Sequence, residues 1–242
     1  MSPVNLYESD AMRVVTGPLI RPGGFAVTDR GLACCPLTAG DRVLDVGCGT
    51  GAVVDYLRRH HGLAAAGIDL CAALLTEGAK AHGGAPLMRG RAEQLPVAAG
   101  RFSAVLSECV LSLCADPHAV LREAWRVLIP GGHLILTDIY ARMPVVAAVA
   151  ERVPVNSCLR GAVDRLTVES RIAAAGFDGV FWEDHTPALI HLAAEMVWNF
   201  GSLDEFWAAV GGPDTAAAMS RGGGCGCRRP GYYLLVARKC GG

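Results

Sequence analysis

The sequence lacks the features that would point to a strongly charged or a lipid partner. Its 22 Lys and Arg residues balance 23 Asp and Glu residues, for a formal net charge of −1, so neither a nucleic acid nor an anionic membrane is expected as partner. No uncharged run approaches the roughly 20 residues of a membrane-spanning helix. The start, MSPVNLYESDAMRVV, carries acidic residues and no apolar signal-peptide core. We therefore expect a cytoplasmic protein without a targeting segment.

Internal repeats and long low-complexity tracts are absent as well. The 242 residues are 52% hydrophobic and 19% charged, which is too apolar for a disordered chain and sufficient for a substantial core. We expect a single domain, with an N-terminal cap in residues 1–40, a cofactor-binding core in 41–140, and a lid with C-terminal strands in 141–242. The small-residue run after Gly211 and the GGGCGC stretch at 222–227 are typical of flexible loops.

From residue 41 onward, short apolar runs alternate with helical patterns. The predicted strands are Arg42–Val46, Ala64–Asp69, Pro86–Arg89, Ser103–Ser107, His133–Thr137, Asp178–Trp182 and Tyr232–Ala237. The predicted helices are Ala52–His61, Cys71–Ala81, Pro117–Leu128, Val145–Arg152 and Thr167–Ala175. This alternation predicts an α/β fold, a doubly wound, mostly parallel seven-stranded sheet with a lid after the fifth strand. Ligands of such sheets bind beyond the carboxyl ends of the strands.

A glycine-rich loop follows the first predicted strand in RVLDVGCGTGA, residues 42–52. The loop also satisfies the G-x-G-x-x-A form of the dinucleotide-binding fingerprint, so an NAD-linked oxidoreductase is one interpretation. Asp45 argues against it, because a carboxylate inside a buried strand needs a cationic or donor-rich ligand group. The ammonium group of an amino acid is such a partner. Asp69, at the end of the second strand, can accept ribose hydroxyls of either cofactor.

Four motifs resemble the class I S-adenosylmethionine-dependent methyltransferases: VLDVGCGTG (43–51), GIDL (67–70), GRAEQLP (90–96) and LREAWRVLIPGG (121–132). The resemblance implies a Rossmann-like fold and S-adenosyl-L-methionine as cofactor. It implies cofactor contacts from Asp45, Gly47, Cys48, Gly49, Gly51, Asp69, Leu70, Ala92, Glu93 and Ser107. Arg91 departs from the family, which often has an acidic residue there. Tyr7 is expected to close over the sulfonium, or else to pack in a loop on the sheet.

The methyl acceptor is less constrained. Methyl transfer needs chiefly orientation, and a general base only where the nucleophile bears a proton. The candidate bases Tyr7, Glu108, His118 and His185 lie in no recognisable catalytic motif. A small organic molecule methylated at oxygen, nitrogen or carbon is one alternative for the acceptor. A different alternative for the chain itself is a thiol-rich binding or redox module that senses the cofactor without transferring a methyl group.

Cysteines offer a different acceptor site, since the ten cysteines should be thiols in a reducing compartment. Segments before strand one, after strand four and after strand five can converge at the carboxyl end of the sheet. The stretches SECVLSL (107–113), TDIYAR (137–142) and NSCLRGAV (156–163) resemble the arsenite methyltransferases. The resemblance implies that trivalent arsenic, a soft ion suited to thiolates, is bound by Cys34 or Cys35, Cys158, and Cys225 or Cys227.

The other cysteines have simpler interpretations. Free cysteine is often buried, so Cys71, Cys109 and Cys114 are expected to fill the core and Cys48 to be a small residue of the glycine loop. Cys240 is expected to be an exposed thiol. A structural zinc site is not expected, because there is no C-x-x-C motif with a matching second pair. The oligomeric state is left open.

Overall fold

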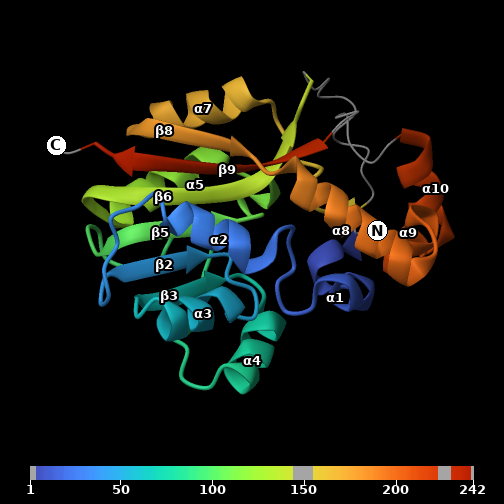
Figure 1. The fold of residues 1–242 in the computed structure, drawn as a ribbon, viewed down its shortest axis with the longest axis horizontal. Coiled ribbons are helices and arrows are strands. Elements are labelled where there is room, and N and C mark those ends of the chain that lie inside the picture. The colour runs from blue at the N-terminus through green and yellow to red at the C-terminus, as the bar shows by residue number, and fades with distance from the viewer. Residues whose placement is uncertain (1–3, 144–154, 223–229, 241–242) are drawn as a thin grey trace.

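A computed structural model describes residues 4–143, 155–222 and 230–240 (Figure 1). Its main sheet has seven strands in the order β4-β3-β2-β5-β6-β9-β8. The strands are β2 (Arg42–Val46), β3 (Ala64–Asp69), β4 (Leu87–Arg89), β5 (Phe102–Glu108), β6 (Leu128–Ala141), β8 (Phe177–Asp184) and β9 (Pro230–Lys239). Strands β2 to β6 run parallel, and β9 is antiparallel to both β6 and β8. The predicted seven-stranded, mostly parallel sheet is confirmed.

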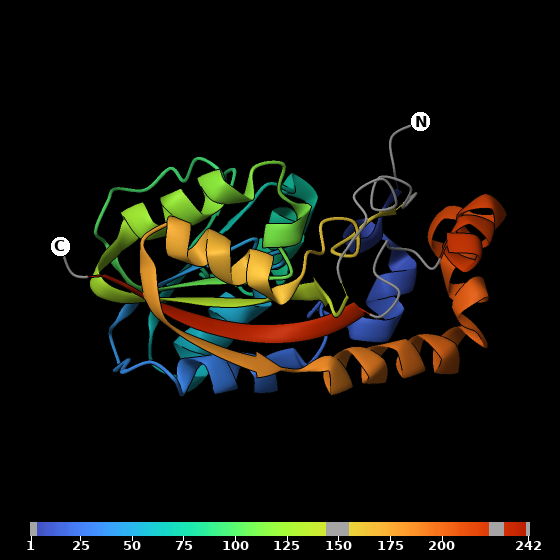
Figure 2. The same cartoon turned by 90° about the horizontal axis from the view of Figure 1, so that it is seen from above.

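Helices cover both faces of this sheet, as the two views in Figures 1 and 2 show. One face carries α2 (Gly24–Leu32) and α3 (Ala52–His60), and the other carries α5 (Pro117–Val127) and α7 (Arg165–Ala174). The period of two along each strand divides the core between the faces. In β2, Val43 packs in the cluster that includes α2 and α3, whereas Leu44 packs in the cluster that includes α5 and α7.

The sequence of α5 explains why a helix forms there. The Asp116 side chain caps the helix by accepting a hydrogen bond from the Ala119 amide at 3.0 Å, and Pro117 occupies the first turn, where its missing N–H is not needed. Its apolar residues recur at helical spacing and are buried: Val120, Leu121, Ala124 and Val127. The helix α4 (Ala72–Ala81) lies beside β4 at the edge of the sheet.

The N-terminal residues pack against helices from the other end of the chain. The short strand β1 (Val4–Asn5) pairs with β7 (Val155–Asn156), and the single turn η1 (Leu6–Glu8) leads into α1 (Asp10–Thr16). Three further helices, α8 (Thr186–Phe200), α9 (Leu203–Gly211) and α10 (Pro213–Gly222), join β8 to β9. Met12 of α1 shares a small apolar core with Met196 of α8 and Phe206 of α9.

One expectation about the second half of the chain is wrong. The run after Gly211 is not a loop but the helix α10, because its alanines have the highest helix propensity. The segment between the fifth and sixth strands of the main sheet, β6 and β8, contains β7 and α7 within the described residues, and three more helices follow β8. The predicted helix Val145–Arg152 lies outside the described residues. No described helix is both long and apolar enough to span a membrane.

Candidate active site

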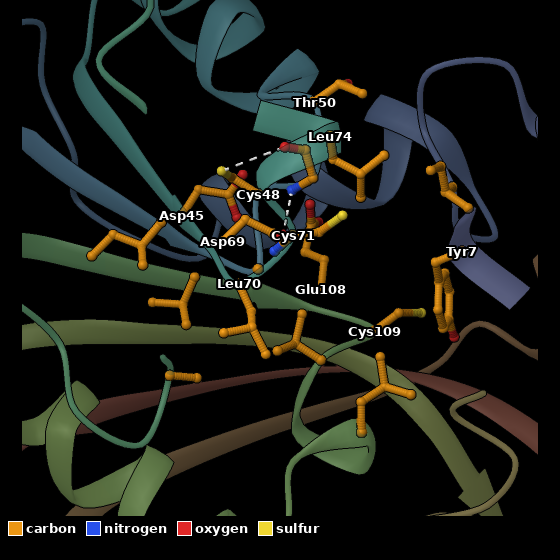
Figure 3. A pocket seen from close by; sticks show the side chains of 18 of the residues that line it. Tyr7, Asp45, Cys48, Thr50, Asp69, Leu70, Cys71, Leu74, Glu108 and Cys109 are labelled. Atoms are coloured by element: carbon orange, nitrogen blue, oxygen red, sulfur yellow. Dashed lines mark hydrogen bonds between the residues drawn. The ribbon is translucent and has the colours of Figure 1, made fainter. Parts of the chain in front are cut away.

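A cavity of about 560 Å³ opens where β2, β3 and β5 end. Its lining comes from the glycine loop after β2, the turn after β3, the loop after β4, the end of β5 and the N-terminal residues (Figure 3). This is the edge at which parallel α/β sheets bind ligands. Of the residues expected to contact a cofactor, the following line it: Tyr7, Asp45, Gly47, Cys48, Gly49, Asp69, Leu70, Ala92 and Glu93.

The glycine loop needs its first glycine for two reasons. Gly47 has a φ of +79°, a backbone conformation that residues other than glycine rarely adopt. A Cβ atom on Gly47 would also lie 2.2 Å from Cγ2 of Val110. Since Val110 itself lines the cavity, the absent side chain lets the loop backbone pass close to the ligand space.

Asp45 is buried beneath the loop, with 3% of its surface exposed. Burial raises the pKa of Asp45 well above its usual value, as does Glu108, whereas Arg21 lowers it. No side chain or amide among the described residues donates a hydrogen bond to this carboxylate, although it lines the cavity. A buried carboxylate without a donor is unfavourable, so the site suits a ligand that brings a cationic donor.

Asp69 is held in place by the backbone. Its two carboxylate oxygens accept hydrogen bonds from the Gly49 amide at 2.8 Å and the Cys71 amide at 2.7 Å. Each oxygen keeps a second lone pair that can accept a ligand hydroxyl. The next residue, Leu70, is 55% exposed and lines the cavity. In the loop after β4, an ion pair of 3.4 Å joins Arg91 to Glu93.

Two expected contacts are not brought to this cavity. Ser107 is 3% exposed and does not line it, because neighbouring side chains of β5 point to opposite faces and Glu108 takes the cavity side. Gly51, the residue directly before α3, has a φ of +78° and is not among the lining residues. His118 and His185 are absent from the lining too, and His185 pairs with Glu183 at 2.7 Å.

A buried ion pair forms part of the cavity wall. Arg21 Nη2 lies 3.0 Å from Glu108 Oε2, and both side chains are about 5% exposed or less. Thr28 donates to Glu108 Oε1 at 3.0 Å and also contacts Arg21. Burial raises the pKa of Glu108, and the Arg21 charge opposes that shift. Arg21 was not among the predicted site residues, since its role depends on the fold bringing the N-terminal residues to β5.

Five cysteines gather at or beside this cavity. Cys48, Cys71, Cys109 and Cys114 line it. Cys109 and Cys114 also pack in the apolar core as expected, whereas Cys71 does not. Cys158 is 2% exposed and donates to the Cys109 carbonyl at 3.2 Å. Sulfur atoms of Cys109 and Cys158 and a carboxylate oxygen of Asp138 all lie within 4.8 Å of one another.

Tyr7 closes over this pair of thiols. Its hydroxyl donates to Cys158 Sγ at 2.8 Å and accepts from the Cys158 amide at 3.2 Å, and Figure 3 shows its ring beside Cys109. Burial raises the pKa of Cys158 well above its usual value. A close backbone approach makes the arrangement possible, because a Cβ on Gly161 would lie 1.9 Å from the Ser112 carbonyl oxygen.

Cys34 and Cys35 lie at the opposite end of the sheet, and their expected convergence with Cys158 is wrong. Cys35 lines a separate cavity of about 300 Å³ with Thr38 and His61, next to the amino ends of β2 and β3. The segment with Cys34 and Cys35 leads directly into β2 and therefore lies at the amino end of that strand, whereas Cys158 lies near the carboxyl ends of the parallel strands. Burial raises the pKa of Cys35 to about 12. Cys225 and Cys227 lie outside the described residues.

Comparisons with known proteins agree with this geometry. A family model described as a methyltransferase domain matches residues 44–136. The demethylmenaquinone methyltransferase of Mycolicibacterium vanbaalenii is 31% identical over 179 residues, which cover 65% of this chain and 77% of that protein. The chain belongs to the class I S-adenosylmethionine-dependent methyltransferases. Because the chain belongs to this family, the interpretation of the glycine loop as part of an NAD-linked oxidoreductase is excluded. The cofactor is S-adenosyl-L-methionine.

Other relatives of this methyltransferase match over shorter spans. The arsenite methyltransferase of Aquipseudomonas alcaligenes is 33% identical over 149 residues, 55% of this chain and 43% of that protein. The malonyl-[acyl-carrier protein] O-methyltransferase of Enterobacter lignolyticus is 32% identical over 100 residues, 41% of this chain and 39% of that protein. The chain therefore spans less than half the length of these two relatives.

Solved structures share the fold of this methyltransferase. The [4+2]-cyclase SpnF is 23% identical with a TM-score of 0.74, and the alignment covers 100% of this chain and 98% of that one. Haemonchus contortus phosphoethanolamine N-methyltransferase 2, in complex with S-adenosyl-L-methionine, is 18% identical with a TM-score of 0.73 and covers 95% of this chain and 56% of that one. At these identities the likeness concerns the fold alone.

Proposed function

We propose that the chain transfers a methyl group from S-adenosyl-L-methionine to a small acceptor, and that this acceptor is a trivalent metalloid such as arsenite held by cysteine thiols. The observation that carries the proposal is the pair Cys109 and Cys158. Their sulfur atoms lie within 4.8 Å of each other, and Cys109 lines the cofactor cavity.

The cavity residues fit the cofactor. Asp45, buried and without a donor, would accept the ammonium of the methionyl part, and Asp69 would accept the ribose hydroxyls. The loop from Gly47 to Gly49 would contact the methionyl part through its backbone, and Ala92 and Glu93 would border the adenine. When bound, the cofactor supplies a methyl group activated by its sulfonium. The protein then needs to orient the acceptor and exclude water.

Two thiols close together suit a trivalent metalloid. Each thiol can condense with arsenous acid, As(OH)₃, so that one As–S bond forms, one As–O bond breaks and the thiol proton leaves with the hydroxide as water. Thiolate sulfur is a soft ligand, and the product keeps a lone pair on arsenic that can attack a methyl group. Because water carries the proton away, no general base is required, which accords with buried thiols whose pKa is raised, as that of Cys158 is.

The backbone at Cys109 supports a functional role for this residue. Cys109 has a φ of +58° and is the sole non-glycine residue with a positive φ within the described ranges. Such a conformation costs about 1–3 kcal/mol and is concentrated at functional sites. The relative described as an arsenite methyltransferase adds support from a different direction.

A second candidate acceptor is a carbon of an aromatic ring. Of the three sequence relatives named above, the demethylmenaquinone methyltransferase is matched over the largest share of its own length, 77%. Methylation at such a carbon releases a proton, and Glu108, buried in the cavity wall, would be the acceptor of that proton. In this case replacing Glu108 by Gln would abolish turnover of the aromatic acceptor, whereas the metalloid reaction has no step in which Glu108 takes up a proton.

Calorimetric titration with arsenite tests the metalloid proposal. The wild-type chain and the matched control Cys240→Ser, which changes an exposed thiol, should bind arsenite alike. Cys109→Ser and Cys158→Ser should each weaken binding at least tenfold, because each removes one As–S bond. Arsenite binding that is absent from the wild type, or is unaffected by both substitutions, would overturn the proposal.

A further inference from the structure

Asp138 completes a buried cluster that methyl transfer to a thiol-bound metalloid does not require. The carboxylate, Cys109 and Cys158 are 2%, 6% and 2% exposed, and one ligand atom from each lies within 4.8 Å of the other two. We propose that these three residues form a binding site for a soft or borderline divalent cation, Zn²⁺ or Cd²⁺, and that this cation blocks the acceptor end of the cavity.

The donor set and its spacing suit such an ion. Two thiolates and one carboxylate are ligands that Zn²⁺ accepts, with Zn–S bonds of about 2.3 Å and Zn–O bonds of about 2.0–2.2 Å. Two donors on one tetrahedral ion are therefore about 3.5–3.8 Å apart. The donor atoms of the cluster lie within 4.8 Å of one another, so side-chain movements of less than about 1 Å each bring them to this spacing. Hard ions such as Mg²⁺ prefer oxygen ligands and are not expected.

Hydrogen bonds already orient the carboxylate. Ser112 donates to Asp138 through its amide at 2.9 Å and its hydroxyl at 2.6 Å, and the Ile139 amide donates at 2.8 Å. Oδ1 accepts two of these bonds, whereas Oδ2 accepts only the bond from the Ser112 amide and keeps a lone pair for an ion. Tyr7 donates to Cys158 Sγ at 2.8 Å. Ligating carboxylates and thiolates in metal sites are held by such outer contacts.

The ion has a path to the site and an effect once there. Cys109 lines the cavity, so a cation enters through the same opening as the acceptor. Three protein ligands leave one position of a tetrahedral ion for water or an incoming group. Binding forms two metal–sulfur bonds and releases two thiol protons to the buffer. The thiols are then unavailable to a metalloid acceptor.

Cadmium titration of the chelator-treated chain tests the site, with the cadmium–thiolate absorption band and proton release as readouts. The wild type and Cys240→Ser should bind one tight equivalent and release two protons. Cys109→Ser should lose the tight equivalent. Asp138→Asn should keep the thiolate band and bind about 10- to 100-fold more weakly. If Asp138→Asn binds as tightly as the wild type, or Cys109→Ser keeps the tight equivalent, the inference is overturned.

Two further measurements keep the result unambiguous. Should Asp138→Asn fail to fold, Ser112→Ala removes the hydroxyl donor at 2.6 Å and should weaken cadmium binding about tenfold; unchanged affinity in that variant overturns the inference. The metalloid proposal is assayed separately in chelator-containing buffer. Methylated arsenic without a tight cadmium site would refute the cation site alone, and a tight cadmium site without methylated arsenic would refute the metalloid acceptor alone.

Discussion

Replacing Asp45 by Asn tests the proposed cofactor seat with the least disturbance to its shape. The side chain lines the cavity and receives no hydrogen bond from the described residues, so the substitution removes a charge but no internal contact. If the carboxylate holds the ammonium of S-adenosyl-L-methionine, the variant loses one charge-assisted hydrogen bond. Such a bond contributes about 1.5–3 kcal/mol, which corresponds to a dissociation constant raised about 10- to 150-fold.

The same substitution, Asp45→Asn, should not lower the stability of the unliganded chain, although it lowers the affinity for the cofactor. The pKa of Asp45 is raised in the folded state, so the folded chain binds the proton more tightly and stability falls as pH rises above the usual carboxyl pKa of about 3.9. Asn carries no charge and avoids this loss. Asp45→Asn should therefore be at least as stable as the wild type at pH 7, and its advantage should shrink as the pH is lowered toward 4.

Calorimetry with S-adenosyl-L-methionine and urea unfolding at two pH values measure both effects. Asp41→Asn, at the amino end of the same strand, is the matched control. Hydrogen bonds from Ser103 and Thr38 lower the pKa of Asp41, so this variant should lose stability near pH 7 and keep its cofactor affinity. Cofactor affinity unchanged in Asp45→Asn, or reduced equally in Asp41→Asn, would refute the assignment.

Three other substitutions have expected outcomes. Gly47→Ala should lower the unfolding free energy by about 1–3 kcal/mol, because Gly47 has a φ of +79° and an added Cβ would lie 2.2 Å from Val110. Urea denaturation measures this loss, with Gly49→Ala as control because a Cβ at Gly49 meets nothing within 4 Å. A loss in Gly47→Ala no larger than in Gly49→Ala would count against the prediction. Tyr7→Phe should cost about 1–3 kcal/mol, since it leaves the Cys158 amide without its partner at 3.2 Å; thermal unfolding that matches the wild type would contradict this. Lys239→Met should cost a similar amount because Nζ donates to the carbonyls of Trp125 and Leu128 at 2.7 Å each, and an unchanged denaturation midpoint would show that these bonds do not contribute.

The parallel part of the fold was predictable because its signals are local. Buried strands such as Arg42–Val46 are short apolar runs, and a capping side chain such as Asp116 marks the start of its helix. The helices α8 and α9 were missed because their packing partners are distant in sequence. Met196 and Phe206 find their core against Met12, and no local pattern reveals that contact.

The residues proposed to bind the cofactor were more predictable than those proposed to bind the acceptor, for the same reason. Asp45 and Asp69 belong to continuous motifs at strand ends, where topology fixes their position. The cysteines depend on how separate loops meet. Cys109 was taken as core filler because a lone buried cysteine is usually that, and its pairing with Cys158 follows from the contact between Gly161 and Ser112.

The most direct test of the account is mass spectrometry of products after incubation with methyl-labelled S-adenosyl-L-methionine, arsenite and a small thiol, beside a panel of organic acceptors. We expect labelled methylarsenicals together with S-adenosylhomocysteine, and their loss in Cys158→Ser but not in Cys240→Ser. Label transferred only to an organic acceptor, or methylarsenicals formed equally by Cys158→Ser, would contradict the claim that buried thiols beside the cofactor hold the atom that is methylated.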